Sequence, residues 1–253
     1  MRKLFSAGKP CKAGCQYCFA KWSEIDYKLP QVGMENERMN EKEAIIYPCC
    51  DGEFLDQSML IENLEKTVKK MNKVYLSIST KHFISDDVLN QLSKLNHELK
   101  TSEKGFVKLA ISLSNMSMIK DIESHTLSYV ERLELAKAIK SKGIFLGLTI
   151  KPILPFISAE EYCNIIHDFS PYTKYVLIGG LYLNRNSVFY TQYIKGSNEI
   201  QHRTVKWLPE QPEWEYIEDS KQFQQIRKYA EKKGVLLFDS DVDLIKSYIN
   251  QED

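Results

Sequence analysis

The segment Cys11-Lys-Ala-Gly-Cys15-Gln-Tyr-Cys18 places three cysteines on one short stretch, with the spacing C-x3-C-x2-C. Three thiolates on one loop can each bind a different iron of a cubane [4Fe–4S] cluster, which leaves the fourth iron without a protein ligand. An open metal position is typical of a catalytic site, whereas a structural site is usually closed by protein ligands. The spacing therefore predicts that Cys11, Cys15 and Cys18 hold a catalytic iron–sulfur cluster.

A zinc site is the alternative interpretation of the same three cysteines. A zinc knuckle normally shows a second pair of ligands at C-x2-C or H-x3-H spacing. No such pair follows here, so Cys49, Cys50 or a histidine would have to complete the site. A zinc-binding or iron–sulfur module without catalysis thus stays open beside an enzyme.

Short apolar runs alternate with helical patterns along the chain outside this segment. Strands are expected near residues 2–7 and at 43–47, 74–78, 107–113, 145–150 and 175–178. Helices are expected at 57–72, 85–97, 129–142, 159–168 and 220–233, with capping-box patterns at Ser128–Glu131 and Ser158–Glu161. Apolar strands separated by helices indicate parallel strands covered on both faces. We therefore expect an α/β fold, a partial (β/α)6 TIM-type barrel over residues 1–182.

A smaller C-terminal extension is expected over residues 183–253. Residues 183–216 break the alternating pattern and predict an irregular or hairpin insertion that covers the substrate, and residues 217–253 predict a helix–strand–helix unit. The aromatic and basic side chains of the cover are Tyr190, Tyr193, His202, Arg203, Lys206, Trp207 and Trp214. Such side chains can stack on nucleobases and meet phosphates, and they can equally pack a hairpin on the barrel. Packing is the favoured interpretation.

The chain resembles the radical-SAM superfamily, and within it the spore photoproduct lyase-like branch. Tyr17 precedes the last cysteine of the motif, and Asp51-Gly52-Glu53 partly matches a Gly-Gly-Glu motif that follows the second strand in many members. Further matches occur in the expected order over about residues 10 to 160. They are Thr80-Lys81, Ile111-Ser-Leu-Ser114, Glu123, Thr126, Glu131-Arg132-Leu133, Gly143 and Lys151-Pro-Ile-Leu-Pro155.

The resemblance implies a cofactor, S-adenosylmethionine, that chelates the open iron of the cluster. Reductive cleavage of this cofactor yields a 5′-deoxyadenosyl radical that abstracts hydrogen from a substrate, with an electron from a flavodoxin or ferredoxin. The residues implied to bind the cofactor are Tyr17, Gly52, Glu53, Lys81, Ser112, Ser114 and Pro152. Among them, Lys81 would pair with the cofactor carboxylate, Ser112 and Ser114 would reach the ribose, and Pro152 would line the adenine pocket.

The adjacent cysteines Cys49 and Cys50 follow the second expected strand. Spore photoproduct lyases place a cysteine in this loop as a hydrogen donor to the substrate radical, so the resemblance implies a catalytic role for one of the pair. The alternative is that one or both are small buried apolar residues, as free cysteines often are.

The composition argues against some classes of binding partner. The 34 basic and 34 acidic residues balance, so the chain has no general attraction to nucleic acid or to an anionic membrane. No apolar run approaches the roughly 20 residues that cross a bilayer, and a cytoplasmic location is expected. The substrate is left open between a nucleobase or nucleic acid and a protein or small metabolite, as for an activase, and the oligomeric state is left open too.

Overall fold

The structure is a computed structural model that describes residues 2–6, 11–18, 43–50, 52–54, 57–196, 200–204 and 213–252. Three residues singled out from the sequence, Asp51, Lys206 and Trp207, lie outside these ranges.

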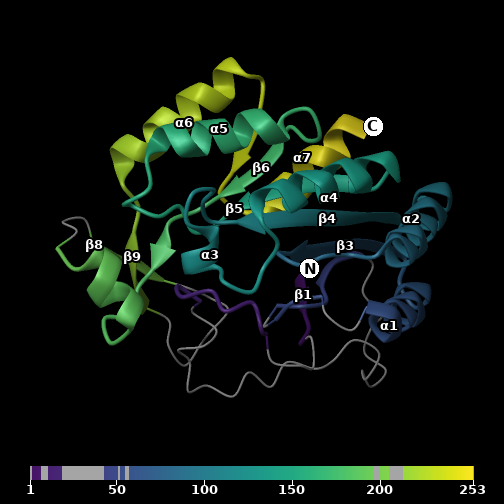
Figure 1. The fold of residues 1–253 in the computed structure, drawn as a ribbon. Helices are drawn as coiled ribbons and strands as arrows, with labels where there is room; N and C mark the ends of the chain where they lie inside the picture. The colour runs from purple at the N-terminus through teal and green to yellow at the C-terminus, as the bar shows by residue number, and fades with distance from the viewer. Residues whose placement is uncertain are drawn as a thin grey trace.

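A seven-stranded sheet forms the centre of the described structure (Figure 1). Its order is β1-β2-β3-β4-β5-β6-β10, and every neighbouring pair is parallel. The strands are β1 (Arg2–Leu4), β2 (Glu43–Tyr47), β3 (Lys73–Thr80), β4 (Gly105–Leu113), β5 (Phe145–Ile150), β6 (Tyr175–Ile178) and β10 (Leu236–Phe238). Parallel strands bring all their carboxyl ends to one edge of the sheet, where loops of such folds carry function.

The expected α/β class, with a mostly parallel sheet, is confirmed, and all six predicted strands are present. The sheet differs from the prediction in having a seventh strand. Leu236–Phe238 pairs with β6 through the register Leu236–Tyr175, so part of residues 217–253 completes the same sheet rather than lying apart from it. The division into units at residue 182 stays a prediction.

Helices flank the sheet on both faces. They are α1 (Gln57–Lys69), α2 (Asp86–Thr101), α3 (Ile119–Ile122), α4 (Tyr129–Ser141), α5 (Ala159–Phe169), α6 (Ser220–Lys232) and α7 (Asp241–Glu252). The capping box at Ser128 and Glu131 is confirmed, because each side chain bonds the other residue's backbone N–H. At Ser158 only half of the expected box forms. The Glu161 carboxylate instead accepts from the backbone N–H of Met116, at 2.6 Å.

The two faces of the sheet are covered differently. Side chains such as Val74, Leu76 and Ile78 pack against α1, α2 and their neighbours in the main core. Alternate residues face the other way, because side chains along a strand alternate in direction. They meet α7, whose Tyr248 ring stacks on Phe145 with 3.6 Å between centroids. The helix that ends the described chain therefore packs on the face opposite to the main helical layer.

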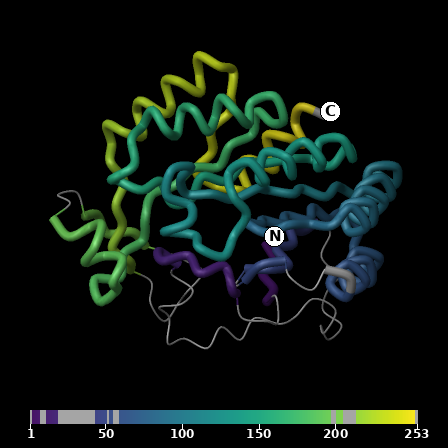
Figure 2. The backbone as a smooth tube through the Cα atoms, viewed as in Figure 1, coloured from purple at the N-terminus to yellow at the C-terminus, as the bar shows by residue number. Residues whose placement is uncertain are grey.

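A small antiparallel sheet lies beside the large one, in the order β7-β9-β8. Its strands are β7 (Leu181–Tyr182), β8 (Ile200–Thr204) and β9 (Glu213–Ile217), and a π-helical turn spans Tyr190–Ile194. Of the two alternatives expected for residues 183–216, an irregular or a hairpin insertion, the antiparallel pair β8–β9 is of the hairpin kind. Figure 2 shows the purple segment that carries the first cysteines running beside the green segment of this region. The Tyr17 and Phe189 rings meet edge to face there, 6.2 Å apart.

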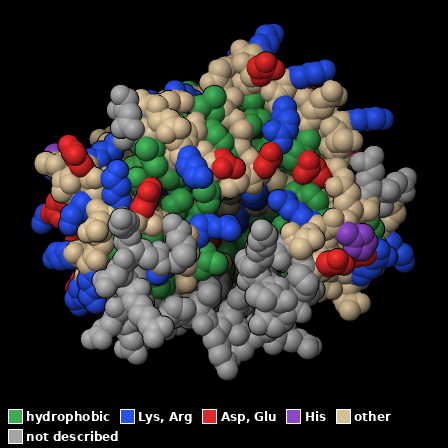
Figure 3. Space-filling model, turned by 180° about the vertical axis from the view of Figure 1, so that it is seen from behind, with side chains coloured by type: hydrophobic (Ala, Val, Ile, Leu, Met, Phe, Trp, Pro, Cys, Tyr) green, Lys and Arg blue, Asp and Glu red, His purple; other side chains and the backbone are tan. Residues whose placement is uncertain are grey.

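Basic and acidic side chains are interspersed over the face seen in Figure 3, as the balanced composition leads one to expect. No helix among the described residues is long and apolar enough to cross a membrane.

Candidate active site

A cavity of about 350 Å³ lies at the carboxyl ends of the parallel strands. The segments after β1 and β2 line it with Cys11, Ala13, Cys15, Tyr17, Cys18, Cys49, Cys50, Gly52 and Glu53. The later strand ends and the small sheet line it with Ser79, Lys81, Ser112, Lys151, Pro152, Gly179, Gly180, Leu181, Tyr182, Arg203 and Tyr216. The structure therefore brings every predicted site residue except Ser114 to one cavity.

The cysteine segment is held by backbone hydrogen bonds to the loop after α3. The Gln16 N–H donates to the Ile122 carbonyl at 2.9 Å, and the His125 N–H donates to the Ala13 carbonyl at 3.2 Å. Gly14 lies between them with φ +71°, a conformation that glycine adopts at little cost. A Cβ at Gly14 would lie 2.7 Å from the Ser124 hydroxyl. Glycine in the motif thus permits both the turn and this close contact.

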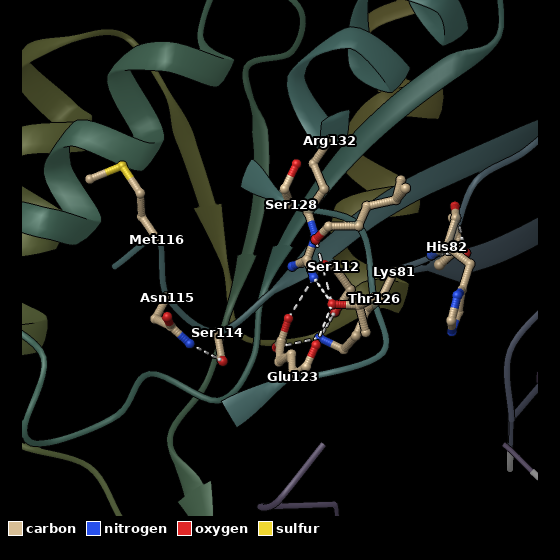
Figure 4. Close-up of polar contacts among 12 residues, drawn as sticks. Lys81, His82, Ser112, Ser114, Asn115, Met116, Glu123, Thr126, Ser128 and Arg132 are labelled. Carbon is tan, nitrogen blue, oxygen red and sulfur yellow. Dashed lines mark hydrogen bonds and ion pairs between the residues drawn. The ribbon is translucent and has the colours of Figure 1, made fainter. Parts of the chain in front are cut away.

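Glu123 connects the cysteine segment to β3 and α4, and Figure 4 shows its contacts with Lys81 and Arg132. Its carboxylate is fully buried and accepts from Lys81 Nζ at 2.9 Å and from an Arg132 guanidinium nitrogen at 2.7 Å. The Tyr17 hydroxyl also donates to it. Arg132 donates in addition to the Ser112 carbonyl at 2.9 Å. One carboxylate therefore ties the residue before Cys18 to the end of β3 and to α4, and Arg132 extends this network to β4.

The charges around Glu123 explain its ionisation. Burial raises the pKa of this carboxyl, but Lys81 and Arg132 together outweigh burial and lower the pKa to about 2. Burial, followed by the charge of Glu123, raises the pKa of the Tyr17 hydroxyl well above its ordinary value. Tyr17 therefore stays a neutral donor to an ionised Glu123 at physiological pH.

Lys81 and Glu53 meet at the end of β3. The Glu53 carboxylate accepts from the Thr80 hydroxyl at 2.9 Å and from the Lys81 backbone N–H at 3.1 Å. Lys81 Nζ also donates to the Ser112 hydroxyl at 3.1 Å and lies 5.7 Å from the centre of the Tyr17 ring. Four residues predicted from motifs to bind a cofactor thus contact one another.

Ser114 departs from the predicted arrangement. It directly follows β4, which ends at Leu113, and its side chain hydrogen-bonds Tyr17. Ser114 is fully buried, its hydroxyl accepts from the Asn115 side-chain amide at 2.9 Å, and it is not part of the cavity wall. Its contact with a ribose stays a prediction.

Cys49 and Cys50 both line the cavity, with Cys49 partly buried and Cys50 exposed. The Cys50 thiol donates to the Tyr47 carbonyl at 3.4 Å, and the Cys50 N–H donates to the Phe5 carbonyl at 2.9 Å. The pair lies at the end of β2, beside the cysteine segment that follows β1. A catalytic role for either thiol stays a prediction.

The sequence interpretation gave no role to several residues that build the cavity. Glu123 and Arg132 were noted only as motif matches. Their opposite charges, within one short stretch of those motifs, were a usable signal of an ion pair. Lys151, Gly179 and Gly180 follow apolar strands, which marks them for this edge of the sheet. Further cavity residues without a predicted role in cofactor binding include Tyr182, Arg203 and Tyr216.

The cysteine set fits an iron–sulfur cluster. A cluster spreads its ligands over separate irons, so its cysteines need to face one cavity, as Cys11, Cys15 and Cys18 do. Within the described ranges no three His, Cys, Asp or Glu side chains are grouped as ligands of a single ion. Burial raises the pKa of the Cys15 thiol to about 11, so its thiolate needs the compensating charge that bound iron supplies.

Known proteins of similar fold were found by structure. No family model matches the chain. A spore photoproduct lyase variant superposes with a TM-score of 0.60 at 14% identity, over 90% of this chain and 73% of that one. Another variant, with bound AdoMet and dinucleoside spore photoproduct, gives 0.58 at 13% identity, over 88% and 72%. Together these likenesses define the class of fold, which is the radical-SAM, spore photoproduct lyase-like fold.

Two further proteins are similar to the chain. Uncharacterized protein MJ0683 of Methanocaldococcus jannaschii is 24% identical over 220 residues, which are 79% of this chain and 74% of that protein. Streptococcus suis SuiB, bound to S-adenosylmethionine, superposes with a TM-score of 0.51 at 12% identity over 93% of this chain. The chain spans 49% of SuiB, about half of its length.

Proposed function

We propose that the chain is a radical-SAM enzyme that holds a [4Fe–4S] cluster on Cys11, Cys15 and Cys18 and reductively cleaves S-adenosylmethionine. The observation that carries the proposal is the convergence of these three cysteines and Lys81 on one cavity. The fold of the chain, shared with proteins whose structures contain this cofactor, supports it. When bound, cluster and cofactor supply a 5′-deoxyadenosyl radical that abstracts hydrogen from the substrate.

Lys81 is the residue best placed to hold the cofactor carboxylate. Glu123 offsets one of the two positive charges of Lys81 and Arg132, so this group keeps a net charge of +1. Lys81 Nζ has three protons, of which Glu123 and Ser112 accept two. The ammonium faces the cavity and is positioned from behind by a buried carboxylate, which suits it to an anionic ligand.

Glu53 is suited to the cofactor amine. Its carboxylate has about four lone-pair positions, and its two donors among the described residues, the Thr80 hydroxyl and the Lys81 N–H, share one of its oxygens. Gly52 before it leaves the wall free of a side chain. The partial match to a Gly-Gly-Glu motif therefore keeps the glycine and the acid where the backbone borders the cavity.

Two thiols complete the proposal. A cysteine S–H is weak enough to give a hydrogen atom to a carbon radical, and we assign this role to one of Cys49 and Cys50 at the cavity wall. The electron that starts each turnover comes from a flavodoxin or ferredoxin. The substrate stays open between a nucleobase or nucleic acid and a protein or small metabolite.

The test is anaerobic reconstitution with iron and sulfide, followed by dithionite and S-adenosylmethionine. We expect about four irons per chain, and release of 5′-deoxyadenosine measured by liquid chromatography. Cys15→Ala should lose both the brown absorbance and the product. Cys163→Ala is the matched control, because this thiol lies on α5 outside the cavity wall, and it should keep both.

Two outcomes would contradict the proposal. One zinc per chain and no 5′-deoxyadenosine would mean that the cysteines form a structural zinc knuckle. Bound iron without cleavage in the wild type would favour a non-catalytic module. The Lys81→Met variant separates cofactor binding from iron loading. It should keep the iron and weaken cofactor binding at least about tenfold, since a charge-assisted contact is lost.

A further inference from the structure

Two cations line the cavity on the side formed by the ends of β5 and β6 and the small sheet, which we name the β5–β6 side. Lys151 directly follows β5, and Arg203 lies in β8. Within the described part of the chain, neither forms an ion pair with a carboxylate. Glu53 is the one carboxylate among the described residues of the wall, and it is engaged with Thr80 and the Lys81 N–H at the end of β3.

The carboxylates nearest to Lys151 are committed to other partners. Asp241 accepts from Lys108 at 2.5 Å and from Ser77 at 2.8 Å. Asp239 pairs with Arg227 at 2.7 Å. Lys151 Nζ itself donates only to the Asp239 backbone carbonyl, at 3.0 Å, among the bonds of the described residues. Two of its three protons are therefore available to a ligand.

Both cations are held in place by their surroundings. The Lys151 side chain lies across Gly179, where a Cβ would come within 2.4 Å of its Cε. The Arg203 guanidinium lies 5.0 Å above the centre of the Tyr216 ring. Tyr216 is fixed in turn, because its hydroxyl accepts from the Gly180 N–H at 2.5 Å. Gly179 thus leaves room for the Lys151 side chain, and Gly180 positions Arg203 through its hydrogen bond to Tyr216.

The two like charges act on each other. Burial, and after it the charge of Arg203, lowers the pKa of Lys151 to about 8, against the opposing effects of Asp241 and Asp239. Neighbouring cations that face a cavity without a carboxylate between them are stabilised when an anion binds there. The arrangement costs stability in the free protein and favours an anionic ligand.

We propose that Lys151 and Arg203 form an oxyanion-binding subsite that takes a phosphate or carboxylate group of the substrate. The inference rests on the proposed function, since it assigns a feature of that enzyme's substrate. The subsite is separate from Lys81, because β4 lies between β3 and β5 and two strand spacings put roughly 10 Å between them. The cavity can therefore hold the carboxylate of a cofactor and a second anion at the same time.

The experiment measures protection of Lys151 in the full-length wild-type chain. A succinimidyl ester acylates accessible neutral amines, and mass spectrometry of peptides reports the rate at each lysine. Labelling at pH 8 is compared in inorganic phosphate, in acetate and in chloride at equal ionic strength. We expect phosphate or acetate to slow acylation of Lys151 at least threefold and to leave the exposed Lys232 of α6 unchanged.

The arms distinguish the two oxyanions. Protection by phosphate alone assigns a phosphate-bearing substrate, and protection by acetate as well assigns a carboxylate. Arg203→Met should abolish the protection and Arg203→Lys should keep part of it, with thermal unfolding midpoints showing that both variants fold. Equal rates in phosphate, acetate and chloride would overturn the subsite.

A second readout on the same preparation separates this inference from the enzyme class. Release of 5′-deoxyadenosine without anion protection would overturn the subsite and leave the proposed chemistry intact. Protection without any cofactor cleavage would support the subsite and contradict the proposed chemistry.

Discussion

The two sides of the cavity differ in whether their cations are paired with a carboxylate. On the side formed by the ends of β1 to β4, the buried Glu123 carboxylate lies between Lys81 and Arg132 and neutralises part of their positive charge. On the β5–β6 side, Lys151 and Arg203 lie near each other with no described carboxylate paired to either. The first side is a buried ion-pair network with one carboxylate for two cations, and the second is a pair of cations with no paired carboxylate among the described residues.

This difference indicates what each side is for. A buried ion-pair network that already forms in the free protein fixes its members in position, as a binding site for a constant ligand requires. Lys81 is held in this way beside the cysteine segment. Cations without a counter-ion instead gain stability when a ligand arrives, which suits a substrate that enters and leaves. Four predictions follow from the contrast.

Removing the charge of Glu123 should strongly destabilise the protein. Glu123→Gln leaves Lys81 and Arg132 in a buried place without their carboxylate, and breaking a buried pair in this way costs about 3–5 kcal/mol. Urea denaturation measures the loss. Glu98→Gln is the control, because its pair with Lys94 is exposed and spans 4.0 Å, and it should cost less than about 0.5 kcal/mol. Similar losses in both variants would show that the β1–β4 side is not a tight network.

Acid should reveal the same network in the wild type. The folded-state pKa of Glu123, about 2, lies below the ordinary value of 4.5, so the stability from its ionisation is present above about pH 4.5 and is lost as pH falls toward 2. At 1.36 kcal/mol per pKa unit the loss is about 3 kcal/mol. Urea denaturation between pH 6 and 3 should show the gap between wild type and Glu123→Gln narrowing below pH 4.5. A gap that stays constant would contradict an ionised Glu123.

The fold and the β1–β4 side follow largely from sequence, for a physical reason. Strand positions are set by local apolar runs, and β2, β5 and β6 begin and end at the predicted residues. Lys81 directly follows β3 and the cysteine segment lies in the connection after β1, and parallel strands bring such positions to one edge of the sheet. Their meeting in one cavity is therefore a consequence of the topology that the sequence predicts.

The β5–β6 side could not be predicted in this way. Arg203 reaches the cavity from an antiparallel hairpin that is far from Lys151 in sequence, and no local pattern specifies that approach. The role of Gly179 and Gly180 depends on which side chains cross them in space. Ser114 shows a second limit, since whether a side chain lines the cavity or is covered by its neighbours is not specified by the strand pattern.

Tyr216→Phe should disturb the β5–β6 side and leave the β1–β4 side intact. The Tyr216 hydroxyl accepts from the Gly180 N–H and donates to Glu218 at 3.0 Å. Its loss leaves a buried N–H without an acceptor, which costs about 1–2 kcal/mol. Thermal unfolding should show that cost, while iron loading of the cysteines should not change. A variant that loses iron as well would mean that the two sides are not independent.

A further effect should appear at alkaline pH and should arise from Lys151. Its folded-state pKa of about 8 lies below the roughly 10.4 of an unfolded chain, so between these values the unfolded state binds more protons. The contribution of Lys151 to the free energy of unfolding therefore rises as pH increases from about 8 to about 10. That direction means that the charged form of Lys151 destabilises the fold, whereas the charged form of Glu123 stabilises it.

Urea denaturation between pH 7 and 10 separates Lys151 from the other titrating groups. Lys151→Met should be at least as stable as the wild type at pH 7 and should lose this advantage toward pH 10. Lys232→Met, on the exposed face of α6, should follow the wild-type curve at a constant offset. Phosphate should stabilise the wild type more at pH 7 than at pH 10, because the anion binds the protonated amine. Parallel curves for Lys151→Met and the wild type would remove the electrostatic contrast between the two sides, because Lys151 would then carry its charge at no cost to the fold.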